Sequence, residues 1–482
     1  MSECYKGRMD EQASVMPLTA PRRKIPGPRG HFLLGSLRER QTDPLKLFET
    51  AARTYGPVFK LRFGPIRVLV VNDPEGVRHI LHENAKNYIK GLGYDKLAPL
   101  FGNGLLTSEG EFWRRQRRLA QPAFHRQRIE GFTRTMAEVT DQTARQWSET
   151  IEKNSKEARP TEILPTEILS EMMQIAYRIV SRTLFTSQID EDVSTVRSAL
   201  DLLSTEANHR ITHPIGLPSF LPTLRNRRNH AAVESMNGVI YKIIAQRRAA
   251  PERHSDLLSM LMDARDEDTG QGMTDSQLRD EIMTLFTAGH ETTAMALTWT
   301  IYLLSKNPEI ESKLLAELDH VLGDGSRPLS FQDLPQLSYL SWTIQESMRI
   351  YPPGWMISRQ ALGEDVVCGY RIRKNQVVLT PPWLMHRNEK YWPDPEKFDP
   401  TRFSPEQEAR RPKLAYYPFG AGPRQCIGNT FALTEMHFVL AGLLRRFRFR
   451  LLDGHPVVPH PQITLRPKYG MPMFIEPRLR SN

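Results

Sequence analysis

Cysteine is scarce in this chain, and long apolar runs are missing from it. The 482 residues include three cysteines, which are too few for a disulfide framework or a four-cysteine zinc site. No run of about 18 apolar residues occurs, so the sequence predicts no transmembrane anchor. Residues 1–24 lack the apolar core of a signal peptide and end in basic residues. We therefore expect a cytoplasmic protein in which residues 1–24 form a flexible basic tail.

The composition is that of a folded protein with a basic surface. Hydrophobic residues make up 39% of the chain and charged residues 25%, which is too apolar for a disordered protein. The 36 prolines are spread along the sequence and separate many elements. No internal repeat or long linker is present, so we expect one large domain over residues 25–482. The net charge of +10 fits a polyanion, an anionic membrane or an acidic protein partner, and does not choose among them.

Helical patterns outnumber strand patterns. A helix is predicted over 44–55, between a capping Asp-Pro and a glycine. The runs 58–63 and 66–71 are rich in β-branched and aromatic residues and are joined by Gly-Pro, which predicts a hairpin. Residues 366–379 predict a second hairpin, and most of 110–320 has helical periodicity. The predicted fold class is therefore mainly α with small β-sheets.

The longest predicted helix covers 275–306 and has an unusual centre. Thr274 and Gln277 form a capping box at its start. The centre, Ala-Gly-His-Glu-Thr-Thr at 288–293, forms helix poorly, because Gly costs about 1 kcal/mol relative to Ala and β-branched Thr adds more. A glycine and two hydroxyls can also bend the helix. Taken alone, this segment is most simply interpreted as a packing notch beside a solvated Glu291.

A glycine-rich loop carries the third cysteine. Residues 419–428 are Phe-Gly-Ala-Gly-Pro-Arg-Gln-Cys-Ile-Gly; a proline-rich irregular stretch leads into them and a long apolar helix follows. A helix N-terminus favours the cysteine thiolate. The loop is neither a Walker A loop nor a dinucleotide fingerprint. A cysteine nucleophile would need a base, and the loop contains no histidine. Metal ligation by the soft thiolate of Cys426 fits better.

This loop resembles the haem-binding loop of the cytochrome P-450 family. Four other segments are similar to motifs of that family, and all five occur in the family's order within residues 25–475. The four segments are Trp113-x-x-x-Arg117, Ala288-Gly-x-Glu291-Thr292-Thr293, Glu346-x-x-Arg349, and Arg402 in the run Phe-Asp-Pro-Thr-Arg-Phe. The joint occurrence of five ordered motifs by chance is negligible.

The resemblance implies a haem b cofactor and a single domain of the cytochrome P-450 fold. Cys426 would be the metal ligand, and Phe419 and Gly428 would belong to the loop that holds the cofactor. The residues implied as partners of the haem carboxylates are Trp113, Arg117, Arg359 and Arg424. Trp113 and Arg117 would lie about 40° apart on one helix, and indole and guanidinium N–H groups suit carboxylates.

The resemblance also implies a monooxygenase that inserts one atom of O2 into an unactivated C–H bond. Thr292 and Glu291 would be the catalytic residues that relay protons to oxygen. Three residues would form a structural brace for the proline-rich stretch: Glu346, Arg349 and Arg402. The substrate would be an apolar small molecule, a fatty acid or a terpenoid, and His209-Arg210 could meet a carboxylate at the entrance.

The implied electron donor is a separate protein, a ferredoxin or flavodoxin with its reductase, acting on a monomeric oxygenase. About 56 residues follow Cys426, too few for a flavin or nicotinamide domain. Arg114, Arg115 and Arg118 would point away from the haem carboxylates and form the docking face for an acidic donor.

The sequence leaves two alternatives to a monooxygenase open. A haem-thiolate peroxygenase or isomerase would lack the acid–threonine pair, so Glu291 and Thr292 argue against it. A basic non-enzymatic binding protein would explain the charge but not the ordered motifs. Of the other cysteines, Cys4 lies in the tail, and Cys368 is predicted to be a buried strand thiol.

Overall fold

The computed structural model describes residues 23–91, 93–157, 165–185, 193–212, 221–249, 254–323, 327 and 329–478. The basic tail predicted over 1–24 therefore lies almost wholly outside the described residues. Among the described helices, none is long and apolar enough to cross a membrane.

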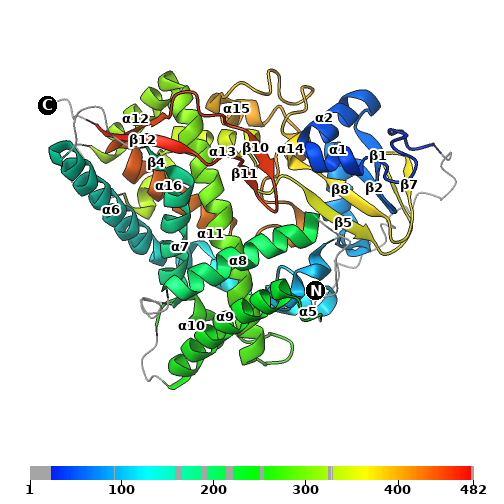
Figure 1. Ribbon diagram of the computed structural model, residues 1–482, viewed down its shortest axis with the longest axis horizontal. Coiled ribbons are helices and arrows are strands. Elements are labelled where there is room, and N and C mark those ends of the chain that lie inside the picture. The colour runs from blue at the N-terminus through cyan, green and yellow to red at the C-terminus, as the bar shows by residue number, and fades with distance from the viewer. Residues whose placement is uncertain are drawn as a thin grey trace, which may run out of the picture.

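A body of packed helices surrounds α11 (Asp275–Lys306), which runs through its middle (Figure 1). The helices packed on α11 include α7 (Ile168–Phe185), α13 (Ser338–Ile350) and α16 (Asn429–Leu444). The predicted capping box is confirmed, because Thr274 Oγ1 accepts from Gln277 N at 3.2 Å and Gln277 Oε1 accepts from Thr274 N at 3.0 Å. A second helix of equal length, α6 (Arg126–Glu157), lies at the outer end of the body and was not distinguished in the sequence.

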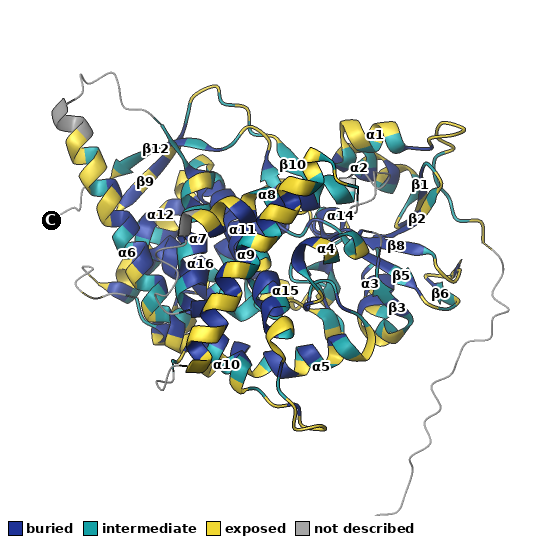
Figure 2. Ribbon diagram, turned by 60° about the horizontal axis from the view of Figure 1, so that its bottom comes forward, coloured by how far each residue is buried: buried dark blue, intermediate teal, exposed yellow. Residues whose placement is uncertain are grey.

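The remaining helices cover this body or join it to the sheets. They are α1 (Leu37–Thr42), α2 (Pro44–Tyr55), α3 (Pro74–Arg78), α4 (Ala98–Phe101), α5 (Gly110–Ala120), α8 (Val193–Thr212), α9 (Leu224–Ala249), α10 (Leu257–Asp263), α12 (Pro308–Leu322), α14 (Pro382–Met385) and α15 (Pro405–Glu408). Figure 2 shows α11 largely buried, whereas α8 and α9 each have an exposed side. The helix predicted over 44–55 is confirmed as α2, and the helix-rich character of 110–320 is confirmed in the part that is described.

The largest sheet has five strands in the order β1-β2-β8-β5-β3. The strands are β1 (Val58–Phe63), β2 (Ile66–Val71), β3 (Tyr88–Lys90), β5 (Ile357–Ala361) and β8 (Val377–Thr380). The predicted hairpin is confirmed, with Phe63 opposite Ile66. Strand β8 is parallel to β2 and antiparallel to β5, and all four of its residues are buried, as suits a central strand.

The second predicted hairpin, over 366–379, is only partly right. β6 (Asp365–Val367) and β7 (Tyr370–Ile372) form a separate two-stranded hairpin, and β8 leaves it for the large sheet. β8 begins with three apolar residues and gains more by burial on both faces than it would at the edge of a small hairpin. The other strands are β4 (Thr166–Glu167), β9 (Phe447–Leu451), β10 (Pro459–Pro461), β11 (Leu465–Pro467) and β12 (Pro472–Pro477). The mainly α fold with small sheets is confirmed.

Candidate active site around Cys426

Cys426 lies in the loop between a short 3-10 turn and α16. Its N–H donates to Phe419 O at 2.9 Å, which closes the loop. Gly422 has a φ of 69°, and a Cβ there would lie 1.9 Å from Leu81 O, so only glycine fits. Cys426 is an exposed residue, yet protein atoms surround its thiol closely. This enclosure raises the pKa of the Cys426 thiol, while the backbone N–H of Gly428 and the charge of Arg117 lower it.

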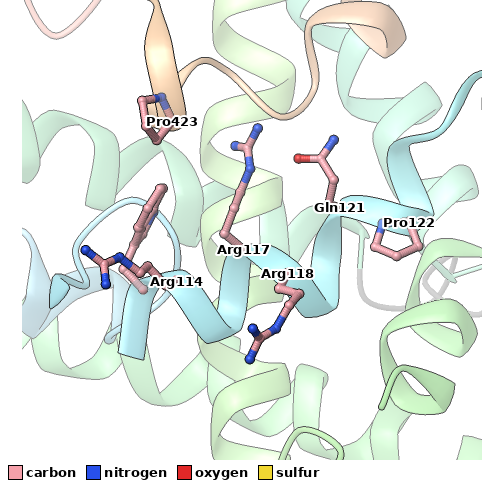
Figure 3. A pocket seen from close by; sticks show the side chains of 7 residues that line it. Arg114, Arg117, Arg118, Gln121, Pro122 and Pro423 are labelled. Atoms are coloured by element: carbon pink, nitrogen blue, oxygen red, sulfur yellow. The ribbon is translucent and has the colours of Figure 1, made fainter. Parts of the chain in front are cut away.

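Helix α5 presents two side chains to this loop. Arg117 Nη1 donates to Gln425 O at 2.9 Å. Trp113 is buried, and the Arg424 guanidinium lies 4.4 Å from the centre of its ring. Figure 3 shows Arg117 extending from α5 to the side on which Pro423 lies. The spacing-based prediction that Trp113 and Arg117 face the same way is thus consistent with the structure.

An unbalanced group of cations lies beside Trp113. Arg424 is ion-paired with Glu109, and Lys90 N donates to Glu109 Oε1 at 2.8 Å. Arg359 is 7% exposed, and burial lowers the pKa of Arg359. Burial and the nearby Arg424 charge also lower the pKa of Lys90 to about 7. Of the three basic side chains, Arg424 is ion-paired with Glu109, whereas the Lys90 ammonium donates to Leu105 O and Ser108 O and Arg359 donates to Ser358 O.

This group fits a cofactor that carries carboxylates. Arg424 Nη1 is buried and has no acceptor among the described residues. A buried donor of this kind is costly unless a partner is supplied. An anionic group that entered beside Arg424 and Arg359 would supply that partner and would offset the excess positive charge. Haem, with two carboxylates, has this chemistry.

Sequence reasoning missed Lys90 and Glu109. Two local signals were available: a lone lysine at the end of an apolar strand, and a glutamate four residues before Trp113. Neither signal shows that the two residues meet Arg424, which is 315 positions away from Glu109 along the chain.

The centre of α11 has one accessible face. Ala288 is exposed and Thr292 is half-buried, although most of the helix is buried. Thr292 Oγ1 donates to Ala288 O at 2.7 Å, and Thr293 Oγ1 donates to Gly289 O at 3.0 Å. The hydroxyls thus bond within the helix, and α11 continues as a single helix through this segment.

Glu291 is not the solvated glutamate that the simplest interpretation of this segment predicted, and that prediction is wrong. Its carboxylate is buried and accepts hydrogen bonds from Thr464 Oγ1 and from Arg466, whose Nη2 lies 2.8 Å from Oε1. Thr292 has a different partner, Ala288 O. The physical reason is that β11 packs against α11 and supplies a cation that no local pattern around Glu291 reveals.

Arg466 links Glu291 to a polar pocket. A cavity of about 170 Å³ lies among α7, α8 and α11, and its lining includes Arg466, His290, Tyr177 and Asp201. Asp201 is exposed at this site. His290 Nδ1 donates to Phe286 O at 2.7 Å, which leaves Nε2 as the acceptor of the ring, and burial lowers the pKa of His290. Ionisable groups thus connect Glu291 with the protein surface.

The predicted brace forms a network in which Glu346 and Arg349 are completely buried and Arg402 is partly buried. Arg349 donates to Glu346 from Nε at 2.6 Å and from Nη2 at 2.8 Å. Arg402 Nε lies 3.4 Å from Glu346 Oε1. Arg349 Nη1 also donates to His386 O at 2.8 Å, and Asp399 N donates to Glu346 Oε1 at 3.0 Å. The network therefore ties α13 to the proline-rich stretch that leads to Cys426.

The three arginines predicted to form a docking face differ in their partners. Arg118 pairs with Asp266 at 2.6 Å and with Asp268 at 2.7 Å. Arg115 Nη2 donates to Gly272 O, in the segment between α10 and α11, at 3.0 Å. Arg114 pairs with a glutamate on its own helix and stays half exposed. A surface groove of about 440 Å³ lies here, and its lining comprises Trp113, Arg114, Arg117, Arg118, Gln121, Pro122 and Pro423 (Figure 3).

Cys368 is not the buried strand thiol that the sequence predicted. It lies in the exposed turn between β6 and β7, with a φ of 51°, and Gly369 follows with a φ of 77°. Two successive positive φ values fit the tight turn of a two-residue hairpin. The Cys368 thiol lies 3.6 Å from Asp73 Oδ1, and partial burial together with the Asp73 charge raises the pKa of Cys368 to about 12.

Comparisons with known proteins agree over nearly the whole chain. Residues 25–473 match the family described as Cytochrome P450. Cyclooctatin synthase of Streptomyces melanosporofaciens is 34% identical over 96% of this chain and 97% of its own length. Cyclooctat-9-en-7-ol 5-monooxygenase of the same organism is 35% identical over 88% of each chain. Pentalenene oxygenase of Streptomyces avermitilis is 32% identical over 86% of this chain and 88% of its own length.

Proposed function

The chain belongs to the cytochrome P450 family, and we propose that this monooxygenase hydroxylates an unactivated C–H bond of a terpenoid. The observation that carries the proposal is the full-length similarity to relatives whose names specify cyclooctat-9-en-7-ol and pentalenene as substrates. Both names describe compact, largely hydrocarbon molecules. Such substrates suit an apolar site with few polar contacts.

A fatty acid is the less favoured substrate. The carboxylate anchor suggested by the sequence was His209-Arg210. Arg210 Nε pairs with Glu206 at 2.7 Å, and Arg225 also pairs with Glu206 at 2.7 Å while contacting His209 Nε2 at 3.0 Å. Because Glu206 is already ion-paired with both arginines, it weakens the attraction that they offer a substrate carboxylate.

We propose that Cys426 ligates the iron of haem b through its thiolate. Trp113, Arg117, Arg359, Arg424 and Lys90 would hold the haem carboxylates, and Phe419 and Gly428 would shape the loop around the thiolate. When bound, the haem supplies electron transfer, O2 activation and C–H oxidation. The protein itself would position the substrate, exclude water and deliver protons.

We assign proton delivery to Thr292 and Glu291. The Thr292 hydroxyl lies on the accessible face of α11 and can rotate from Ala288 O toward the reacting oxygen, to which it would present its proton. Glu291 would accept protons at Oε2, because the hydrogen bonds from Thr464 and Arg466 both go to Oε1 and hold the carboxylate in place. The polar pocket beyond Arg466 and Asp201 would connect this carboxylate with solvent.

Electrons would come from a separate ferredoxin or flavodoxin with its reductase, acting on a monomer in the cytoplasm. The groove beside Arg114 and Arg117 supports this proposal, because it lies next to the Cys426 loop and is lined by basic side chains. An acidic protein would be attracted to it.

Three measurements test the proposed function. The reduced protein with carbon monoxide should give the spectrum of a thiolate-ligated haem, and a colourless protein would contradict the cofactor assignment. Soret titrations should show tighter binding of cyclooctat-9-en-7-ol or pentalenene than of matched fatty acids and steroids. Turnover under labelled O2 should then place one labelled oxygen atom in the product. Tighter binding and faster hydroxylation of a fatty acid would overturn the terpenoid assignment but not the monooxygenase.

A further inference from the structure

Three consecutive large apolar side chains are exposed near the start of the described chain. Phe32, Leu33 and Leu34 are 78%, 63% and 45% exposed. The other exposed large apolar side chains of the described part are scattered along it one or two at a time. Isolated exposed apolar residues are ordinary, whereas a contiguous apolar patch marks an interaction site. We call residues 31–35 the apolar tip.

The apolar tip is held in place by the neighbouring hairpin. Arg62 Nη2 donates to Phe32 O at 2.7 Å, and its Nη1 donates to Leu33 O at 3.2 Å. Gly35 N donates to His31 O at 2.8 Å, and His31 N donates to Gly35 O at 2.9 Å. Gly35 has a φ of 63°, and a Cβ there would lie 2.2 Å from Arg62 O. The side chains are therefore displayed by an ordered turn, which would lose little further entropy on binding.

The apolar tip belongs to a strongly basic region. We call residues 23–71 the amino-terminal lobe; they include α1, α2, β1 and β2. This lobe contains ten lysines and arginines and three acidic residues. Its net charge is therefore +7, compared with +10 for the whole chain. The exposed members are Arg23, Lys24, Arg29, Arg38, Lys46, Arg53, Lys60 and Arg67.

These basic side chains have no carboxylate partner in the part of the chain that the structure describes. No ion pair between described residues includes a lysine or arginine of the amino-terminal lobe. Elsewhere many exposed arginines do have carboxylate partners, such as Arg118 with Asp266. The lobe thus combines an ordered apolar protrusion with uncompensated positive charge, and both lie at the same end of the molecule (Figure 1).

We propose that the amino-terminal lobe docks on an anionic phospholipid bilayer, with Phe32 and Leu33 inserted among the acyl chains and the basic side chains at the headgroups. A polyanion such as a nucleic acid would account for the charge, but it would leave the apolar tip in water. A bilayer surface provides negative charge and an apolar layer a few ångströms beneath it, which matches both features. The attachment is peripheral, and it does not depend on the identity of the substrate.

The test uses the haem-loaded full-length protein and vesicle flotation. The vesicles are phosphatidylcholine with phosphatidylglycerol at about 3:1, compared with phosphatidylcholine alone, at low salt and at about 0.5 M salt, where the Debye length falls to about 4 Å. We expect binding to the anionic vesicles that weakens at high salt. Phe32→Ser/Leu33→Ser and Arg38→Glu/Arg67→Glu should each weaken binding at least tenfold, with the haem spectrum unchanged.

Matched control variants come from other parts of the surface. Tyr241→Ser removes an exposed aromatic side chain of α9. Arg134→Glu/Arg145→Glu reverses two exposed charges of α6, which lies at the opposite end of the molecule from α1 in Figures 1 and 2. Both controls should bind vesicles like the wild type.

Three outcomes would overturn the proposal. The first is absence of binding to anionic vesicles. The second is equal loss in the control variants, which would mean nonspecific charge attraction. The third is full binding by Phe32→Ser/Leu33→Ser together with loss in Arg38→Glu/Arg67→Glu, which would identify a polyanion site without insertion.

Discussion

Arg466 Nη2 lies 2.8 Å from Glu291 Oε1, and this ion pair joins strand β11 to the centre of α11. The glutamate is buried, and the arginine side chain is 29% exposed toward the polar pocket. The pair therefore has one end in the protein interior and the other near solvent. We propose that protons reach the carboxylate from this side of α11.

Replacement of Arg466 should show how strongly the two side chains are coupled. Arg466→Met leaves Glu291 buried without its cation, so we expect the unfolding free energy to fall by about 1–3 kcal/mol. This loss is smaller than that expected for a fully buried ion pair, because the Arg466 side chain is partly exposed. Glu291→Gln should cost less, and the double variant should cost less than the sum of the two single ones. Denaturant unfolding of the four proteins measures the coupling. Additive losses would show that the ion pair contributes nothing to stability.

The two neighbouring threonines of α11 allow a matched comparison. Thr292→Ala removes the hydroxyl from the accessible face, and we expect substrate binding to persist while product formed per reducing equivalent falls several-fold and peroxide rises. Thr293→Ala removes a buried hydroxyl bonded to Gly289 O, and it should lower stability without changing this ratio. Measured coupling of NADPH to product checks both. Equal coupling in Thr292→Ala and wild type would exclude Thr292 from the relay.

Cysteine replacement separates the proposed ligand from the second described thiol. Cys426→Ser should abolish the thiolate spectrum and monooxygenase turnover, because a hydroxyl is a far weaker donor to iron. Cys368→Ser should leave both unchanged, since that thiol lies in the β6–β7 turn. The reduced carbon monoxide spectrum of each variant is the measurement. A Cys426→Ser protein with the wild-type spectrum would refute the assignment.

The partners of the α5 arginines change the docking prediction. Arg114→Glu should slow reduction by an acidic donor about tenfold at low salt and reduce the salt dependence, because Arg114 is accessible beside the groove. Arg118→Glu should act mainly on stability, because it places a negative charge against Asp266 and Asp268. Stopped-flow reduction across a salt series, with thermal unfolding alongside, distinguishes the effects. If Arg114→Glu were reduced at the wild-type rate at all salt concentrations, the proposed docking face would be refuted.

Short-range sequence patterns predicted helices and strands, whereas contacts between residues far apart in the chain could not be predicted. The capping box at Thr274 and the stop before Gly56 are short-range patterns, and both helices form where predicted. The pairing of β8 with β2 depends on segments about 300 residues apart, and no periodicity encodes it. The same limit explains the error at Glu291, whose partner Arg466 lies 175 positions away.

The motif residues were found in the sequence because the family motifs are local, but their electrostatic setting was not. Lys90 and Glu109 meet Arg424 only through the fold, so the charge imbalance beside Trp113 could not be read from any one segment. Cys368 was misplaced because Cys-Gly within an apolar run resembles a strand, whereas two positive φ values make it a turn.

Glu281 of α11 should make stability depend on pH. It is 1% exposed; its Oε2 accepts from Leu105 N at 3.0 Å, and its Oε1 has no partner among the described residues. Burial raises the pKa of Glu281 to about 7; the Leu105 N–H and Lys90 act against this, and Asp280 adds to it. The native state therefore keeps this proton to higher pH than the unfolded chain. Stability from this group is complete below about pH 4.5 and falls as pH rises to 7, by up to about 3 kcal/mol.

Glu281→Gln should remove that loss, because the amide oxygen still accepts from Leu105 and no charge has to be buried. We expect the unfolding free energy of the variant to fall less than that of the wild type between about pH 5 and 7. Lys90 contributes a slope of the opposite sign that begins near pH 7, at the upper end of this window, since its lowered pKa makes stability rise with pH. Glu267→Gln, an exposed substitution with the same charge change, should retain the wild-type slope. The measurement is the unfolding free energy from denaturant unfolding at each pH. If this free energy changed with pH equally in Glu281→Gln and wild type, the carboxyl group would titrate alike in the folded and unfolded protein, which would contradict the prediction.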